Sequence, residues 1–140
     1  MENENYIGAS TEDFVDYFKS NSLEDWKEEM LLLNFYSPGH TITPQTMAAA
    51  KEWKNFNAAN LHYGALSGKV SEEMGFELPD KRYKVSFFCE FDDIEVKEEW
   101  EVGWIMRPEL VEAVKQLRFN TEGAKERAEM ALSHAELMLL

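Results

Sequence analysis

The spacing of apolar residues changes along this chain, and that change limits the folds open to it. In the first half of the chain the apolar residues follow helical spacing, as in Leu23, Trp26 and Met30. Over residues 99–107 they alternate with polar residues, which is the pattern of a half-buried β-strand. Helical spacing then returns after Pro108. The sequence therefore predicts an α+β fold: a helical body with one β-hairpin and further helices at the C-terminus.

Two helices are predicted near the N-terminus from their capping residues. Ser10 or Thr11 is a possible cap for the first helix. Ser22, with Asp25 three residues later, resembles a capping box for the second helix. The sequence SPGH is expected to end that second helix.

Two consecutive helices joined by a short polar turn are predicted next, which is a helix-turn-helix. Thr43 is a favourable N-cap and Pro44 suits the first helical position, so one helix is predicted over residues 44–54. The other is predicted over residues 57–74, and Gly75 lies where a C-cap glycine is expected.

A β-hairpin is predicted after this pair of helices. Its strands cover residues 83–91 and 99–107, and the acidic sequence DDIEVKE is expected to connect them as a loop. The side chains expected to share one face of the first strand are Val85, Phe87, Cys89 and Phe91. Pro108 and Thr121 then begin two more helices, and the apolar end of the last, LMLL, is suited to docking on the body or on a second copy. The order of the elements is that of a winged helix.

The helix predicted over residues 57–74 is the recognition helix of such a unit. Its inward side is expected to carry Ala59, Tyr63, Leu66, Val70 and Met74. The outward side, which includes Gly64, is then neutral, and asparagine can pair with adenine while lysine and serine can contact phosphates. The residues predicted to contact nucleic acid are Lys54, Asn57, Asn60, His62, Ser67, Lys69, Lys81, Arg82 and Lys84. Alternatively, Gly64 and Gly68 allow another helix to pack closely.

The distribution of acidic residues supports a different partner. The formal net charge is −13, and residues 90–101 alone hold seven acidic residues and one lysine. Such a segment repels phosphate, so it argues against a DNA-inserting wing. It can instead bind a basic protein surface, as an inhibitor that imitates DNA would, or serve only as a solvated loop. The residues of this alternative protein-binding site are Glu90, Asp92, Asp93, Glu95, Glu98 and Glu99.

Catalytic and metal-binding patterns find little support. Pro79-Asp80 and the later Glu95-Val96-Lys97 fit the loose PD…ExK pattern of metal-dependent nucleases, but the second part is expected in a loop rather than on a strand. The three histidines and Cys89 lack the spacing of a zinc site. Cys89 has the alternation of a buried core residue. We therefore expect a non-enzymatic protein without a cofactor, and a metal-dependent nuclease is the third hypothesis.

One part of the chain resembles a small bacterial domain. The resemblance covers residues 40–118 and is carried by Thr43, Ala48, Ala50, Asn60, Tyr63, Gly64, Leu66 and the sequence MRPEL at Met106–Leu110. The domain accompanies HNH-type, restriction-like endonucleases. The resemblance implies an accessory role connected with DNA rather than an activity, and this chain has no HNH signature of its own.

Length and composition set the remaining limits. The chain has 140 residues, of which 44% are hydrophobic and 13% aromatic, so we expect residues 10–140 to form a single globular domain after a flexible tail over residues 1–9. No apolar run has the length of a membrane span, and the polar N-terminus is unlike a signal peptide. A single cysteine suits a reducing cytoplasm. The function expected first is a nucleic-acid-related accessory domain, with the acidic protein-binding module as the alternative.

Overall fold

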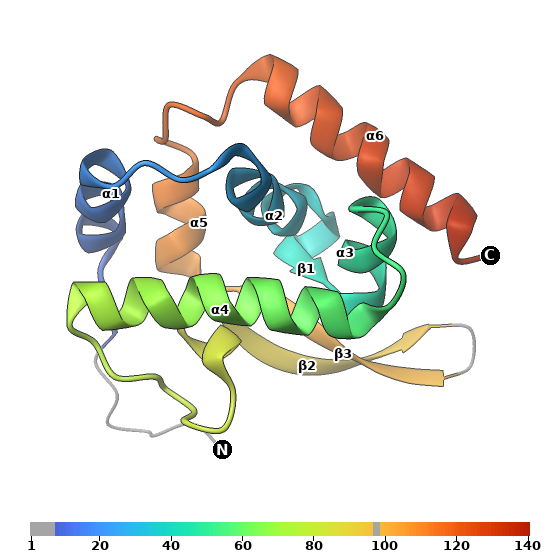
Figure 1. Ribbon diagram of the computed structural model, residues 1–140, viewed down its shortest axis with the longest axis horizontal. Helices are drawn as coiled ribbons and strands as arrows, with labels where there is room; N and C mark the ends of the chain where they lie inside the picture. The colour runs from blue at the N-terminus through green and yellow to red at the C-terminus, as the bar shows by residue number, and fades with distance from the viewer. Residues whose placement is uncertain (1–7, 97–98) are drawn as a thin grey trace.

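The computed structural model describes residues 8–96 and 99–140, and over these residues the chain is an α+β protein, as expected. This part of the chain holds six α-helices, two short 3₁₀-helices and a small antiparallel sheet, whose β2–β3 hairpin lies along one side of the helices (Figure 1). The elements are α1 (Thr11–Ser20), α2 (Asp25–Tyr36), η1 (Pro38–His40), β1 (Thr41–Ile42), α3 (Pro44–Ala50), α4 (Phe56–Met74), η2 (Lys84–Phe87), β2 (Cys89–Val96), β3 (Glu99–Met106), α5 (Pro108–Val114) and α6 (Glu122–Met138).

The sheet has the strand order β1-β3-β2, so β2 lies at an edge. In its register Phe91 lies opposite Trp104 and Asp92 lies opposite Gly103. Helix α4 runs alongside the hairpin, α6 crosses α2 and α3, and α1 packs on α5 (Figure 1). The long helix α4 and the hairpin therefore face each other over the region in which both sequence-based binding sites were predicted.

Several helix boundaries follow the local signals. Ser10 caps α1 and forms a capping box with Asp13. The Thr43 side chain accepts a hydrogen bond from the Thr46 amide at the start of α3. Gly75 ends α4 with a φ of 80°, in the left-handed region that favours glycine. These three predictions are confirmed.

Two predictions about helix ends are wrong. Helix α2 begins at Asp25 after Glu24, without a side-chain cap, and the Ser22 hydroxyl instead accepts a hydrogen bond of 3.2 Å from Arg118. Helix α3 ends at Ala50 rather than near residue 54, because Glu52 has a φ of 59° and turns the chain toward α4.

The predicted strand over residues 83–91 is half wrong. Residues Lys84–Phe87 form η2, and the strand begins at Cys89. Phe87 and Phe88 are both buried, which an extended strand with one buried face does not allow. The prediction that Cys89 is a buried core residue is confirmed.

The acidic sequence expected as a loop belongs largely to a strand. Residues 92–96 lie in β2, paired with residues 99–103 of β3. Asp93 therefore shares a face of the sheet with Phe91 and Cys89, whereas Asp92 and Glu90 share the opposite face. The carboxylates that were expected on a loop are held at fixed positions along an edge strand.

The core includes part of the predicted tail and leaves the C-terminal end uncovered. Residues 1–7 of the predicted tail lie outside the described part of the chain. Ala9, the last residue of that tail, is buried in the core, so the predicted tail extends at least one residue too far. Leu137, Met138 and Leu140 are largely exposed, so the predicted docking of these side chains on the body is wrong. Docking on a second copy stays a prediction. No helix within residues 8–96 and 99–140 has the length and apolar character to span a membrane.

Candidate functional site

An open groove of about 520 Å³ lies between the first turns of α3 and α4, the residues around η2, and the hairpin. We call it the α4–hairpin groove. Val85 and Trp104 are buried beneath it and Phe91 is half-buried. Around them stand exposed side chains from three different elements and one loop: Phe56, Asn60, Tyr83, Asp92, Asp93 and Val102. Buried aromatic and aliphatic groups therefore underlie an opening that is edged by carboxylates.

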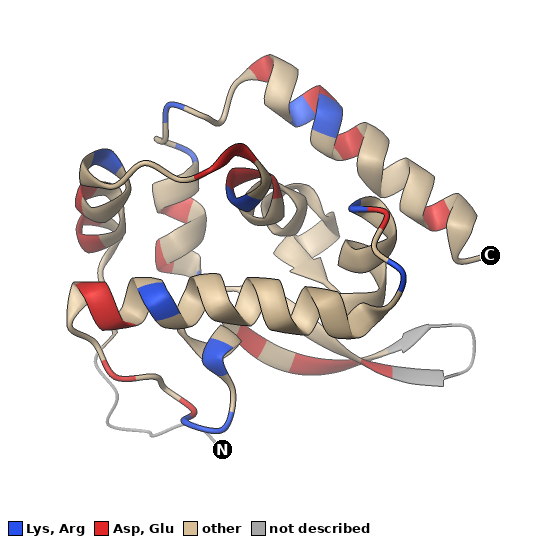
Figure 2. Cartoon of the chain, viewed as in Figure 1, with Lys and Arg blue, Asp and Glu red and all other residues tan. Residues whose placement is uncertain are grey.

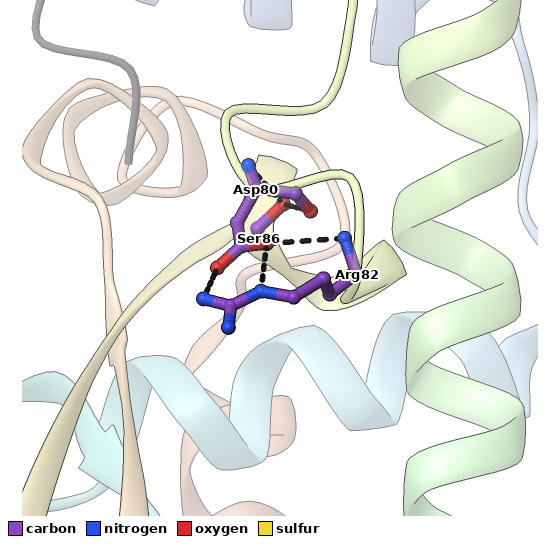
Figure 3. Close-up of polar contacts among 3 residues, drawn as sticks. All are labelled: Asp80, Arg82 and Ser86. Atoms are coloured by element: carbon purple, nitrogen blue, oxygen red, sulfur yellow. Dashed lines mark hydrogen bonds and ion pairs between the residues drawn. The ribbon is translucent and has the colours of Figure 1, made fainter. Parts of the chain in front are cut away.

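A short hydrogen-bonded cluster of Asp80, Arg82 and Ser86 spans the loop before η2 and η2 itself (Figure 3), and Tyr83 follows directly after Arg82. Asp80 accepts hydrogen bonds from the Arg82 amide (3.0 Å) and from Arg82 Nε (3.0 Å) and Nη2 (2.9 Å). The Ser86 hydroxyl donates to the Asp80 carbonyl (3.0 Å) and accepts from the Asp80 amide (3.2 Å). These local bonds compete with strand formation, which explains why the predicted strand is lost here.

Arg107 joins this segment to the end of β3. Its Nε and Nη2 donate to the Ser86 carbonyl at 2.9 and 2.7 Å, and its Nη1 lies 3.5 Å from Glu90 Oε1. Tyr83 is thus carried by a braced segment, and its ring meets Phe91 edge-on with centroids 5.3 Å apart. The Arg82 guanidinium lies 5.4 Å from the centre of the Tyr83 ring.

The Asp80 carboxylate gives a pH-dependent prediction. Hydrogen bonds from Arg82 lower the pKa of Asp80 from 3.8 to about 2 in the folded protein. Because the unfolded chain takes up this proton first, the contribution of Asp80 to stability is complete above about pH 4 and is lost as the pH falls toward about 2. We expect Asp80→Asn to lower the free energy of unfolding at pH 7 and to flatten its slope between pH 4 and 2, measured by urea unfolding. An unchanged slope would contradict this role.

The charged residues among the described lining of the groove are both acidic, whereas lysine and arginine lie nearby before α4 and around η2 (Figure 2). Strand β2 carries Glu90, Asp92 and Asp93, all exposed. The first thirteen residues of α4 contain no Asp, Glu, Lys or Arg. Among the described residues that line the groove, none is a lysine or arginine. A positively charged group that entered here would meet the Asp93 carboxylate beside an uncharged helix face, with Asp92 next to it on the opposite face of β2.

The structure brings together members of both predicted sites. Asn60, from the nucleic-acid set, and Asp92 and Asp93, from the acidic set, line the same groove. Glu90 contacts Arg107 on the opposite face of the sheet. Of the other acidic residues, Glu95 and Glu99 are described only through their backbone pairing, and Glu98 lies outside the described residues.

Part of the predicted nucleic-acid surface faces the protein interior. Ser67 is fully buried and its hydroxyl accepts a hydrogen bond of 3.2 Å from the Phe88 amide. Gly64 is buried as well. The expectation that these residues face outward is wrong, because α4 buries two sides: one against the core and one against η2.

The remaining members of that set are scattered. The His62 ring packs between the Trp26 and Trp53 rings, with centroids 5.3 and 5.0 Å apart, on the side of α4 that faces α2 and α3. Arg82 is bound to Asp80. The other residues of the set are exposed, and they are Lys54, Asn57, Asn60, Lys69, Lys81 and Lys84, the last with its stem against α4.

The two glycines of α4 are approached by a side chain of this same chain. A methyl group added at Gly68 would lie 3.3 Å from Lys84 Cδ, and one added at Gly64 would lie 3.8 Å from Lys84 Cβ. The stem of Lys84 therefore covers both positions. The packing on these glycines comes from this one side chain of η2, and it is tight at Gly68 only.

Gly64 has more room than its burial suggests. Since a contact of 3.8 Å is ordinary van der Waals distance, alanine fits there and gains helix propensity. We expect Gly64→Ala to raise the free energy of unfolding by about 0.5–1 kcal/mol in urea unfolding. Gly75→Ala is the contrasting variant and should cost about 1 kcal/mol because its φ is 80°. A loss of stability in Gly64→Ala would contradict the available space.

Three groove residues were not identified from the sequence. Phe56 lies at the first position of α4, and Gln45 lies in the first turn of α3. Tyr83 lies between basic residues, with Lys81 and Arg82 before it and Lys84 after it. Gln45 also holds a buried Oε1 without a hydrogen-bond partner among the residues that the structure describes. The only local signal in the sequence was the presence of aromatic residues near charged ones. That signal does not show that these three residues line one groove.

Among the described residues, the geometry adds no support for a nuclease site, a metal site or a reactive thiol. The Asp80 carboxylate of the PD…ExK pattern is occupied by Arg82. Glu95 and Val96 of the second part lie in β2, so the expectation that this part lies in a loop is wrong. Over residues 8–96 and 99–140, no group of three or more His, Cys, Asp or Glu side chains is placed to hold a metal ion. Burial raises the pKa of the Cys89 thiol, which keeps it protonated.

Comparisons with known proteins give no relative from which a role for this groove can be taken. No protein-family model, curated protein sequence or solved structure matches the chain.

Proposed function

We propose that this chain is a non-enzymatic accessory domain that recognises a basic surface of a protein partner through strand β2 and the α4–hairpin groove. One observation supports this above all: Asp92 and Asp93 are exposed on an edge strand beside an apolar opening that no described cation lines. Complementary charge speeds association and selects among partners. The resemblance over residues 40–118 makes a DNA-handling enzyme the kind of partner to expect, and the single cysteine suits the cytoplasm.

Contact with nucleic acid through α4 is the second candidate. Its support is the order of elements, since α3 and α4 follow each other and the hairpin follows α4, as in a winged helix. Against it, Ser67 and Gly64 are buried and α4 contains no arginine. Binding to phosphate needs clustered positive charge, and here the adjacent strand is acidic.

Charge-matched variants separate the two candidates. The probes are fluorescein-labelled poly-L-lysine and a mixed-sequence DNA duplex, each titrated with the full chain over a salt series. We expect poly-L-lysine to bind at low salt, and Asp92→Lys/Asp93→Lys to weaken that binding about tenfold or more. Glu72→Lys/Glu77→Lys changes the net charge equally on exposed residues outside the groove and should weaken it much less.

Binding of the DNA duplex tests the second candidate, contact with nucleic acid through α4. Salt-dependent binding of the duplex that Asn60→Ala weakens would favour the nucleic-acid reading over the protein-binding one. Equal losses in the two charge-reversed variants would also contradict the proposal, because they would show a response to net charge alone.

A further inference from the structure

We propose that the α4–hairpin groove binds an extended segment of a partner protein by taking up one apolar side chain that is flanked by lysine or arginine. This inference rests on the proposed function and names the chemistry of its ligand. It follows from where the exposed apolar residues lie, from the charges at the rim, and from the edge position of β2.

The groove gathers exposed apolar surface from separate parts of the chain. Phe56, Tyr83 and Val102 are 45%, 50% and 46% exposed, although each is a large apolar or aromatic side chain. They come from the start of α4, the loop before η2 and strand β3, and they surround the same opening. Contiguous apolar surface with a polar rim is typical of an interaction site.

The shape of the opening favours one inserted side chain. The volume of about 520 Å³ accommodates a phenylalanine, leucine or similar group with part of its backbone. Beneath it the buried Trp104 and the half-buried Phe91 offer aromatic surface. An aromatic side chain gains both apolar burial and edge-to-face contacts there.

The charges at the rim select the neighbours of that side chain. Asp93 lies on the same face of β2 as Phe91, so its carboxylate can meet a cation beside an inserted group, whereas Asp92 lies on the opposite face and adds negative charge along the edge strand. A second copy of this chain is a poor occupant, since it carries a net charge of −13 and the same acidic strand. A basic segment is complementary to this rim.

Strand β2 supplies a backbone edge for an extended segment. In the described sheet its strand neighbour is β3, which leaves its other edge to pair with an added strand. Acidic side chains on an edge strand discourage pairing with like-charged chains and permit pairing with basic ones. Gln45 adds a polar anchor: its unpartnered Oε1 can accept a hydrogen bond from the bound segment once the side chain turns toward the groove.

The test uses the full chain and three labelled peptides of equal length. The first is Ser-Lys-Lys-Phe-Lys-Lys-Ser, the second has alanine in place of phenylalanine, and the third has glutamate in place of every lysine. We expect the phenylalanine peptide to bind about tenfold or more tightly than the alanine peptide by fluorescence polarisation. The glutamate peptide should not bind. Equal affinities for the first two peptides would overturn the inference.

Variants at exposed positions locate the binding. Val102→Lys places a cation at the rim and should abolish binding of the phenylalanine peptide, whereas Leu61→Lys, on α4 outside the groove, should affect it little. Asp92→Asn/Asp93→Asn should weaken binding about tenfold, and the matched Glu72→Gln/Glu77→Gln should not. Equal effects of Val102→Lys and Leu61→Lys would overturn the site.

The outcomes distinguish this inference from the function on which it rests. Suppose that poly-L-lysine binding depends on Asp92 and Asp93 but that the phenylalanine and alanine peptides bind equally. The protein-binding function then stands, and the proposal that an apolar side chain inserts into the groove is wrong. If neither poly-L-lysine nor any peptide binds, both are wrong.

Discussion

Replacement of Asn34 by alanine should lower the free energy of unfolding by about 3 kcal/mol or more. Asn34 is fully buried in α2 and links four parts of the chain. Its Oδ1 accepts hydrogen bonds from the Tyr63 hydroxyl (2.8 Å) and the Cys89 thiol (3.1 Å). Its Nδ2 donates to the carbonyls of His40 (2.9 Å) and Trp104 (3.2 Å). Alanine would leave these groups in the core without their partner.

The size of this loss can be checked against two variants. Tyr63→Phe removes one donor and leaves Asn34 bonded to Cys89, so it should cost only about 1 kcal/mol. Asn57→Ala changes the same residue type at an exposed position and should stay within about 0.5 kcal/mol of the wild type. Urea unfolding followed by circular dichroism measures all three. A cost for Asn34→Ala no larger than that of Asn57→Ala would contradict the network.

Gly103→Val should destabilise the protein by about 2 kcal/mol, although valine is favoured over glycine in strands. A Cβ at this position would lie 3.0 Å from Thr41 Cγ2, 3.2 Å from the Asp92 carbonyl oxygen and 3.3 Å from Ile94 Cγ2. The Asp92 oxygen belongs to the backbone of the paired strand, so it cannot move without shifting β2. Overpacking therefore outweighs the gain in strand propensity.

A pair of alanine variants isolates the cause of that loss. Gly123→Ala would bring its Cβ within 3.3 Å of Arg127 Nη1, which is the mobile end of an exposed side chain. We expect Gly123→Ala to be tolerated and Gly103→Ala to cost about 1 kcal/mol in thermal or urea unfolding. If Gly103→Val instead stabilises the protein, the strands tolerate more separation at this point than the structure indicates.

The predictions that succeeded depend on residues close together in the sequence. Thr43 and Pro44 begin α3, and Gly75 ends α4, because each satisfies a local backbone requirement. At the end of β3 the alternation follows from one buried face, which Trp104 and Met106 occupy, whereas Val102 on the same face is 46% exposed. Such signals act within a few residues and can be read without knowing the rest of the fold.

The predictions that failed depend on contacts between distant residues. Strand β1 has two residues and is defined by its pairing with Ile105 and Trp104, so no repeating pattern marks it. The segment before Cys89 alternates like a strand, yet bonds from Arg107 and among Asp80, Arg82 and Ser86 hold it as a loop and the 3₁₀-helix η2. Local spacing cannot reveal these partners.

The candidate site shows the same division. The acidic residues Asp92 and Asp93 were identified from the sequence as a possible protein-binding site, and Asn60 as a possible recognition residue. That they line one groove depends on the packing of α4 beside the hairpin. Ser67 was placed on the wrong side because α4 has a second buried side, against η2, that helical spacing of the core residues does not show.

The most direct test of the central proposal is a titration of the isotope-labelled full chain with the peptide Ser-Lys-Lys-Phe-Lys-Lys-Ser, followed through backbone amide NMR shifts. If the groove binds the peptide, the largest shifts occur at Phe56, Tyr83, Asp92, Asp93 and Val102. Leu61 and Lys69, on the exposed part of α4, should change little. Shifts at Leu61 and Lys69 on addition of a DNA duplex, with none at the groove on addition of the peptide, would contradict the proposal.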